Sequence, residues 1–453
     1  MCDNLVNPRD SGSPDPLTRG GQWFLARRSR ALLIWLCGSL FYCFQFSLRV
    51  APGAMAEDLM RDFGVQSCSL GILGAFYYNA YASLQVPVGL MLDRLGSHRI
   101  IPAAISFCTV GAFLFSFAEG LAEASIARLL MGAGSACAFI GTIKLITLWF
   151  PPHRKALMIG LTMTFGTVGA TLGTAQLPIM MDSLGWRSSM QTLGIAGGVL
   201  ALMSFFLISA SPGTVSDDKR KTKQEAQPSL KVLEGLKIVI GKPQIWLIAL
   251  FGCLMYVPLA AIADLWGIPF LTKMYTIDRG LAGLYISSIF WGLCLGGPLV
   301  SYLSDRFQRR RPFMVASTLL SAFVYGIIIF YPGLPVFAMI GCLFLGGLFF
   351  GGQVLCFSCI TESLPLWTSG VAVGFANMII MSSGVIFEPL VGFLLDYFWT
   401  GEKLDGIPLY SIETFRLSLS PVFFSLIIAF FVTLFIRESF PKKEVSPRFP
   451  DSP

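Results

Sequence analysis

The chain has 453 residues, of which 54% are hydrophobic and only 13% are charged, and its formal net charge at pH 7 is +7. Soluble globular domains carry about 25% charged residues, so the composition excludes that class and indicates a membrane protein. Lys and Arg are spread over the segments between apolar runs, so the positive charge does not indicate nucleic-acid binding.

The first half of the chain predicts six membrane-spanning helices. Residues 1–30 are polar and contain no apolar core run, so we expect a disordered tail and no cleavable signal peptide. The apolar runs that follow are long enough to cross a bilayer as helices, which satisfy their own backbone hydrogen bonds. They cover about 31–55, 67–92, 100–118, 124–150, 156–181 and 184–210.

The second half predicts six more spans after a change in composition. Residues 211–242 form a charged linker that separates an N-terminal bundle, 31–210, from a C-terminal bundle, 243–437. A tail, 438–453, closes the chain. We therefore expect an all-α membrane protein with twelve transmembrane helices in two pseudo-symmetric bundles. The six further spans cover about 245–271, 281–303, 312–331, 335–358, 370–395 and 417–436.

Two short polar stretches lie at matching places in the two halves. The first, between the second and third runs, reads G-x-x-x-D-R-x-G-x-x-R, and a weaker copy follows 212 residues later. A repeated stretch of this kind indicates an internally repeated membrane protein. The candidate hinge residues are Gly89, Asp93, Arg94, Gly96 and Arg99 in the first copy, and Asp305 and Arg306 in the second.

The spacing and context of these stretches resemble the signature loop of the major facilitator superfamily, between its second and third and its eighth and ninth helices. The resemblance covers about residues 31–437. It implies a secondary transporter whose bundles rock about a site at the middle of the membrane, lined by helices 1, 4, 7 and 10. It also implies that the loop Asp and Arg pair across helix ends, and we expect Glu362 to pair with a loop arginine.

The distribution of positive charge predicts the orientation. Of the 33 Lys and Arg residues, 24 fall on the side of the two hinges, the linker and both tails. Because positive residues stay in the cytoplasm, we expect both termini and both hinges to be cytoplasmic. We expect a monomer in the inner membrane of a bacterium, with the lipid bilayer as its surroundings and no nucleic-acid partner.

Charged residues inside the spans are the candidate functional residues. Each costs roughly 2.5–3.5 kcal/mol to insert, so a charge that is kept there faces protein or a water-filled cavity. Lys144 lies near the end of its span, so we expect its ammonium to reach the membrane surface. The five are Arg49, Arg128, Lys144, Asp264 and Glu388.

Arg49 belongs to a polar stripe with Ser39, Tyr42 and Gln45 on one side of the first helix. Such a stripe predicts a substrate-binding face, and the alternative is an arginine that only reaches the membrane surface. The stretch Leu48–Ala51 resembles the first-helix arginine region of anion-transporting branches of the superfamily. That resemblance implies that Arg49, with Tyr42 and Gln45 beside it, binds the anionic group of a substrate.

Arg128, followed by Gly132 and Gly134, resembles the fourth-helix motif of the superfamily. The resemblance implies either substrate binding and proton coupling or a structural hydrogen-bond hub, and both remain open. Asp264 is the approximate counterpart of Arg49 in the second half. A cation and an anion on opposite sides of a cavity would suit a zwitterion, and Asp264 and Glu388 are both candidates for the coupling proton.

No catalytic constellation, phosphate loop, metal-ligand cluster or cofactor motif stands out, so we expect neither an enzyme nor a bound cofactor or metal. The hypothesis is a symporter or uniporter for a small, carboxylate-bearing solute: an organic acid, an amino acid or, by some resemblance to the lysosomal dipeptide-transporter branch, a dipeptide. The alternatives are proton-coupled multidrug efflux and a transporter-like solute sensor. The fifth span lacks the Gly-Pro pair of the family's antiporter motif, which disfavours efflux.

Overall fold

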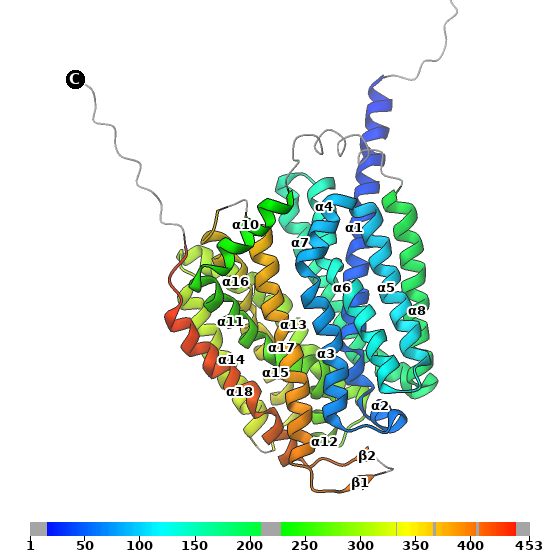
Figure 1. The fold of residues 1–453 in the computed structure, drawn as a ribbon, viewed down its shortest axis with the longest axis vertical. Helices are drawn as coiled ribbons and strands as arrows, with labels where there is room; N and C mark the ends of the chain where they lie inside the picture. The colour runs from blue at the N-terminus through cyan, green and yellow to red at the C-terminus, as the bar shows by residue number, and fades with distance from the viewer. Residues whose placement is uncertain (1–15, 210–227, 332, 366–367, 405–406, 441–453) are drawn as a thin grey trace, which may run out of the picture.

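The computed structural model describes residues 16–209, 228–331, 333–365, 368–404 and 407–440. Within these ranges the chain is helical apart from loops and a hairpin of two short antiparallel strands, β1 (Lys403–Leu404) and β2 (Ile407–Pro408). The helices form two bundles that lie side by side (Figure 1). The predicted all-α fold is confirmed.

The first bundle contains all helices up to residue 209. Its expected sixth span is part of one long element, α8, whose helical geometry breaks at Gly185, where φ is 77°. The left-handed region suits glycine because it lacks a Cβ. The elements are α1 (Pro16–Ala54), α2 (Ala56–Phe63), α3 (Ser67–Ser83), α4 (Gln85–Leu95), α5 (Ser97–Phe117), α6 (Leu121–Trp149), α7 (Pro152–Thr171), the π-helix η1 (Leu172–Gln176) and α8 (Leu177–Ser209).

The second bundle starts with a short helix and contains two irregular segments, a π-helix within the seventh span and a 3₁₀ turn within the tenth. Its elements are α10 (Pro228–Ile240), α11 (Pro243–Pro258), the π-helix η2 (Leu259–Trp266), α12 (Gly267–Tyr275), α13 (Arg279–Phe307), α14 (Arg311–Phe330), α15 (Val336–Phe350), the 3₁₀ helix η3 (Gly351–Val354), α16 (Leu355–Glu362), α17 (Ser369–Tyr397) and α18 (Ile412–Phe435).

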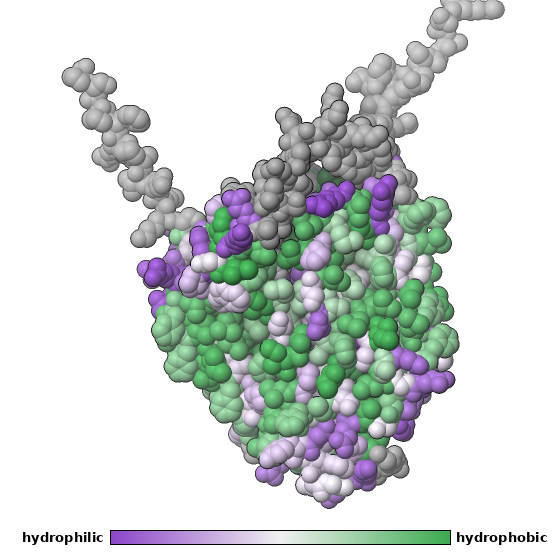
Figure 2. Space-filling model, in the orientation of Figure 1, coloured by the Kyte–Doolittle hydropathy of each residue, from purple (hydrophilic) through white to green (hydrophobic). Residues whose placement is uncertain are grey.

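Ten helices among the described residues are long and apolar enough to cross a membrane. One of them, His153–Ile208, contains two expected spans that meet at Gly185. The expected second span is divided at Leu84 into α3 and α4, and each part alone is shorter than a span. If His153–Ile208 is counted as two spans, and α3 and α4 together as one more, the helices match the twelve expected spans. On the face shown in Figure 2, apolar residues cover most of the middle of the molecule and polar residues gather at its two ends.

Two boundaries differ from the expectations. Helix α1 begins at Pro16, inside the predicted tail 1–30, because extending an existing helix costs less than starting one. Helix α10 lies in the predicted linker 211–242, and buries Val239 where it packs against α17. Residues 1–15, 210–227 and 441–453 lie outside the described residues.

The molecule has two ends, which we name for the argument below. The hinge face is the end where α4 meets α5, and the α2 face is the opposite end, which carries α2, α12 and the hairpin (Figure 1). Near the α2 face the bundles contact each other through glycines. A Cβ on Gly71 would collide with the backbone of Glu388, and one on Gly283 with the backbone of Thr174. Small residues allow such close helix approach.

Candidate functional site

Arg49 is 3% exposed and reaches from the first bundle into the second. Its Nη1 donates a hydrogen bond of 2.8 Å to the Tyr256 hydroxyl on α11. Its Nη2 lies 3.5 Å from the Met381 sulfur on α17. The side chain therefore stands between the bundles rather than at the membrane surface, which overturns the alternative of an arginine that only reaches the surface.

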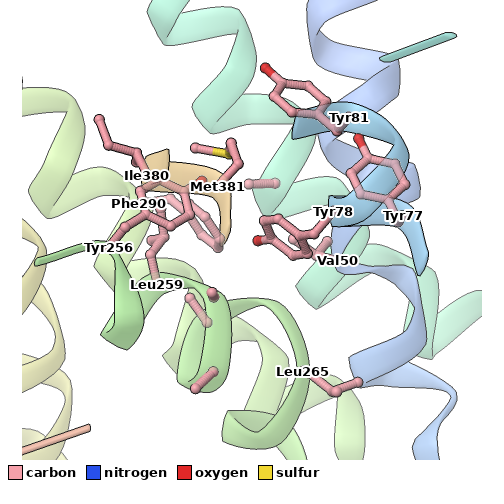
Figure 3. Close-up of a cluster of buried hydrophobic side chains, with 14 of the residues drawn as sticks. Val50, Tyr77, Tyr78, Tyr81, Tyr256, Leu259, Leu265, Phe290, Ile380 and Met381 are labelled. Carbon is pink, nitrogen blue, oxygen red and sulfur yellow. The ribbon is translucent and has the colours of Figure 1, made fainter. Parts of the chain in front are cut away.

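Aromatic rings surround the Arg49 guanidinium. Its central carbon lies 4.9 Å from the Phe46 ring centroid, 5.2 Å from that of Tyr78 and 5.3 Å from that of Tyr81. Figure 3 shows Tyr78 and Tyr81 on one side, facing Tyr256 and Met381 on the other. Ring faces attract a desolvated cation. The cluster stabilises a buried positive charge and leaves phenolic hydroxyls beside it.

Asp264 is the acidic partner of this cation. It lies in η2, and its Oδ2 is 4.0 Å from Arg49 Nε. The Tyr78 hydroxyl donates a hydrogen bond to the same oxygen, while Oδ1 is buried and has no hydrogen-bond partner among the described residues. We expected two charges separated by a cavity. They are in direct contact instead, because an isolated buried charge is costly and the π-helix brings the carboxylate inward.

Arg128 is buried behind Arg49. It donates a hydrogen bond of 2.8 Å to the carbonyl of Leu48 and one of 3.5 Å to that of Arg49, and its guanidinium lies 4.6 Å from the Tyr77 ring centroid. These contacts fix the backbone of α1 where Arg49 leaves it. These contacts fit the structural role that was one of the two alternatives for Arg128. Its other alternative, substrate binding and proton coupling, stays a prediction.

The rest of the polar stripe turns away from the second bundle. Ser39 shares a 3.1 Å hydrogen bond with Thr162 on α7, and the Tyr42 hydroxyl lies 3.8 Å from the Met163 sulfur on the same helix. The Gln45 side-chain oxygen accepts a 2.9 Å hydrogen bond from Tyr77. Only Arg49 of this stripe contacts the second bundle through a hydrogen bond among the described residues.

Glu388 is buried on α17 near the same interface. Its Oε2 makes no hydrogen bond in the part of the chain that the structure describes, and a Cβ on Gly74 of α3 would collide with the carboxyl group. The Trp266 indole donates a 3.0 Å hydrogen bond to the Glu388 carbonyl. Glu388 and Asp264 are therefore two buried acidic groups, each with one oxygen that makes no hydrogen bond within the described ranges, and of the two only Asp264 forms an ion pair with Arg49 there.

A charged clasp joins the bundles at the α2 face. Arg279, at the start of α13, contacts Asp58 at 2.5 Å and Asp182 at 2.6 Å, and both carboxylates belong to the first bundle. These three residues line a cavity of about 380 Å³. We call them the Arg279 clasp. The clasp was not foreseen from the sequence, and it closes the α2 face over the central site.

The first hinge pairs within its own bundle. Asp93 contacts Lys144 at 2.7 Å, and the same ammonium donates a 2.6 Å hydrogen bond to the Leu92 carbonyl. Lys144 thus reaches the surface as expected and meets an acid there. Arg94 and Arg99 are exposed and make no ion pair within the described part of the chain. Gly96, with φ of 81°, makes the turn between α4 and α5.

The second hinge uses a different arginine from the one we expected. Asp305 contacts Arg310 at 2.5 Å, and Glu362 contacts the same guanidinium at 2.7 Å, whereas Arg306 has no ion pair among the described residues. Burial alone lowers the pKa of Arg310, but Glu362 and Asp305 outweigh it and raise that pKa above its usual value. The correction follows from helix geometry: α13 ends at Phe307, so the chain turns before Arg310.

Sequence reasoning found the buried charges and missed their partners. The missed residues that contact Arg49 or close the α2 face are Phe46, Tyr78, Tyr81, Tyr256, Met381, Asp58, Asp182 and Arg279. The pattern Tyr77-Tyr78-x-x-Tyr81 inside an apolar span was an available signal, because buried tyrosines need a polar partner for each hydroxyl.

The chain is similar to curated transporters over part or most of its length. It is 21% identical to the hexuronate transporter of Bacillus subtilis, over 81% of this chain and 87% of that protein. It is 27% identical to the D-galactonate transporter of Escherichia coli O6:H1, over 38% of this chain and 40% of the relative. Several other matches span between 37% and 61% of the relative's length.

Solved structures share the fold. A bacterial homologue of the human lysosomal transporter Spinster, in an inward-facing and occupied conformation, superposes with a TM-score of 0.70 at 16% identity, covering 88% of this chain and 95% of that one. A D-xylose–proton symporter gives 0.68 at 14% identity, covering 91% and 98%. The family model of the Major Facilitator Superfamily matches residues 34–268 and 259–452. The chain therefore belongs to the Major Facilitator Superfamily.

Proposed function

We propose that this protein is a secondary transporter that moves a small hydroxylated carboxylate, such as a sugar acid, across a bacterial inner membrane. The observation that carries the proposal is Arg49, a buried guanidinium that reaches from one bundle to the other. The hexuronate and galactonate transporters among its relatives support an anionic substrate. In this proposal the hinge face and both termini are cytoplasmic.

Arg49 suits a carboxylate for a geometric reason. Its planar fork of donors matches the two oxygens of a carboxylate, which an ammonium cannot do. In this structure its acidic neighbour is Asp264, whose Oδ2 lies 4.0 Å from Arg49 Nε. Arg49 Nε makes no hydrogen bond within the described part of the chain. A substrate carboxylate would take the guanidinium in place of Asp264. Substrate binding would thereby release one of the contacts that hold the bundles together.

The same exchange offers a route for proton coupling. When Asp264 gives up Arg49 to the substrate, its carboxylate loses a cation in a buried place, and protonation removes the resulting charge. Glu388, whose Oε2 is unsatisfied, is the second candidate for the proton. Cotransport of one proton with one carboxylate would then carry no net charge across the site.

The hydroxyl groups around the guanidinium favour a hydroxylated substrate. Tyr81 and Tyr256 both contact the Arg49 guanidinium, and a phenol can donate and accept. Amino acids and dipeptides also carry a carboxylate, but their ammonium group needs a free anion. Asp264 keeps its hydrogen bond from Tyr78 after Arg49 turns to the substrate, and protonation in the coupling step removes its charge, so the site favours an acid without an amino group.

The test is uptake into proteoliposomes by Arg49→Lys, normalised to inserted protein. We expect at least a hundredfold loss with a sugar-acid substrate, because a bidentate charged contact is lost in a buried site. Arg154→Lys, at an exposed arginine, is the matched control and should transport like wild type. Near wild-type uptake by Arg49→Lys would remove Arg49 from the binding site.

The substrate panel separates the alternatives. Sugar acids, amino acids, dipeptides and lipophilic cations should be tested side by side, and we expect uptake of sugar acids alone. Export of lipophilic cations would instead support multidrug efflux, and binding without any flux would support a sensor. In Asp264→Asn we expect sugar-acid counterflow to continue while stimulation by an imposed proton gradient is lost.

A further inference from the structure

A deep groove on the outside of the first bundle has no part in the proposed transport mechanism. It has a volume of about 840 Å³ and runs between α5 and α8. Arg99 lies at one end of it, at the first turn of α5. The apolar part of its lining includes Pro102, Val110, Gly198, Leu202 and Phe205.

Between its charged end and its far end, the groove offers no free hydroxyl donor among the residues that the structure describes. Its two hydroxyl groups are already used: Ser106 donates to the Pro102 carbonyl at 3.0 Å, and Thr109 donates to the Ile105 carbonyl at 2.9 Å. An occupant of this space is therefore apolar.

The surroundings of the groove identify the medium that it faces. Val110 is 50% exposed, Leu202 60% and Phe205 56%, and all three side chains line the groove. Large apolar side chains on the outside of a membrane helix face lipid tails. An acyl chain of the bilayer is thus the apolar group at hand to fill the groove.

The Arg99 end of the groove is positively charged. Arg99 is exposed and has no acidic partner within the described ranges, since nearby Asp93 is engaged by Lys144. The neighbouring His98 Nδ1 is buried and makes no hydrogen bond in the described part of the chain. Both residues belong to the first turn of α5, whose helix dipole also favours an anion.

We propose that this groove is a binding site for an anionic phospholipid of the leaflet at the hinge face. One acyl chain lies between α5 and α8, and the phosphate is bound by Arg99 with His98 beside it. A zwitterionic lipid offers the same tail but adds a cation next to Arg99, so the site distinguishes lipids by headgroup charge. In this proposal Arg99, a residue of the hinge motif, binds the lipid phosphate instead of an acidic side chain.

The experiment is native mass spectrometry of the purified full chain, delipidated and titrated with phosphatidylglycerol or with phosphatidylcholine of the same acyl chains. We expect one phosphatidylglycerol to be retained about fivefold more tightly than phosphatidylcholine, the preference that one basic residue supplies near a membrane surface. Arg99→Gln should abolish that preference, and Arg154→Gln, at an exposed arginine outside the groove, should keep it.

A second variant keeps the proposal testable if Arg99→Gln does not fold. Gly198→Leu fills the groove, and a Cβ at this position meets only the Thr109 methyl carbon at 3.8 Å, an ordinary contact. We expect this variant to lose the tightly held lipid although Arg99 is present. Equal retention of both lipids by wild type, or unchanged preference in either groove variant, would overturn the proposal.

Discussion

The two ends of the molecule use their charged residues differently. At the α2 face the Arg279 clasp joins the bundles, and glycines such as Gly283 bring their backbones into contact. At the hinge face every ion pair among the described residues stays within one bundle, as with Lys144 and Asp93 or Arg310 and Glu362. The difference indicates that the α2 face is the closed end, and that opening it requires breaking bonds between the bundles.

The difference also separates two kinds of charged contact. A bond between bundles must form and break in each transport cycle, so its strength affects the balance between conformations. A bond within a bundle persists through the cycle, so its strength affects the stability of that bundle. Substitutions at the two ends should therefore change different measured quantities.

The largest effect is expected at the close backbone contact of the α2 face. Gly283→Ala places a methyl group against the Thr174 carbonyl of the other bundle, where backbone cannot move aside. We expect transport to fall by about a hundredfold or more, since the α2 face can no longer close. Gly341→Ala is the matched control, because a Cβ there meets nothing within 4 Å. Wild-type uptake by Gly283→Ala would contradict a requirement for this contact.

The second hinge should respond in stability rather than in conformational balance. Arg310→Gln leaves Glu362 and Asp305 without their cation, and the Arg310 side chain is only 9% exposed. We expect a loss of about 2 kcal/mol in unfolding free energy, below the range for a fully buried pair because the Asp305 side chain is 62% exposed. Thermal unfolding in detergent measures it. An unchanged midpoint would show that this cluster does not stabilise the bundle.

Removing the clasp should open the α2 face. Arg279→Gln eliminates both contacts between bundles, and we expect a several-fold rise in labelling of Thr272→Cys, which lines the adjacent cavity. An impermeant thiol reagent applied to intact cells, in a background with Cys68 replaced by serine, measures the rise. Arg187→Gln, at an arginine that pairs with Asp62 in its own bundle and outside the clasp, is the control. Equal labelling in both variants would argue against the clasp.

The smallest effect is expected at the first hinge. Asp93 is 73% exposed, and exposed ion pairs contribute about 0–1 kcal/mol. Asp93→Asn should therefore lower the unfolding midpoint much less than Arg310→Gln does. We also expect it to slow transport while sparing substrate binding, because Lys144 loses its partner at the junction of α4 and α5. A midpoint shift as large as that of Arg310→Gln would erase the distinction between the two hinges.

The fold was predictable from the sequence because the bilayer permits few solutions. Apolar runs of sufficient length must be helices, and the repeated hinge stretch divided them into two halves. The break at Leu84 had a local signal that was overlooked, because Pro87 lacks the N–H that would bond to the Ser83 carbonyl, and α3 ends at Ser83.

The central site was predictable only in part. Arg49, Asp264 and Glu388 stood out because an ionised side chain in an apolar run is costly. Their mutual distance did not follow from the sequence, since a π-helix shifts Asp264 relative to regular helical spacing. Arg310, the partner of Asp305, was missed because the motif was interpreted from spacing alone, without the turn that follows α13.

The Arg279 clasp also makes the molecule sensitive to the electrolyte around it. The Arg279 side chain is 27% exposed and that of Asp182 is 52% exposed, so dissolved ions can reach both groups once they part. Mobile ions stabilise separated charges, and at an ionic strength of 0.15 M their influence extends over about 8 Å. A concentrated medium at the α2 face would thus favour the open form, and a dilute one the closed form, without any change in substrate.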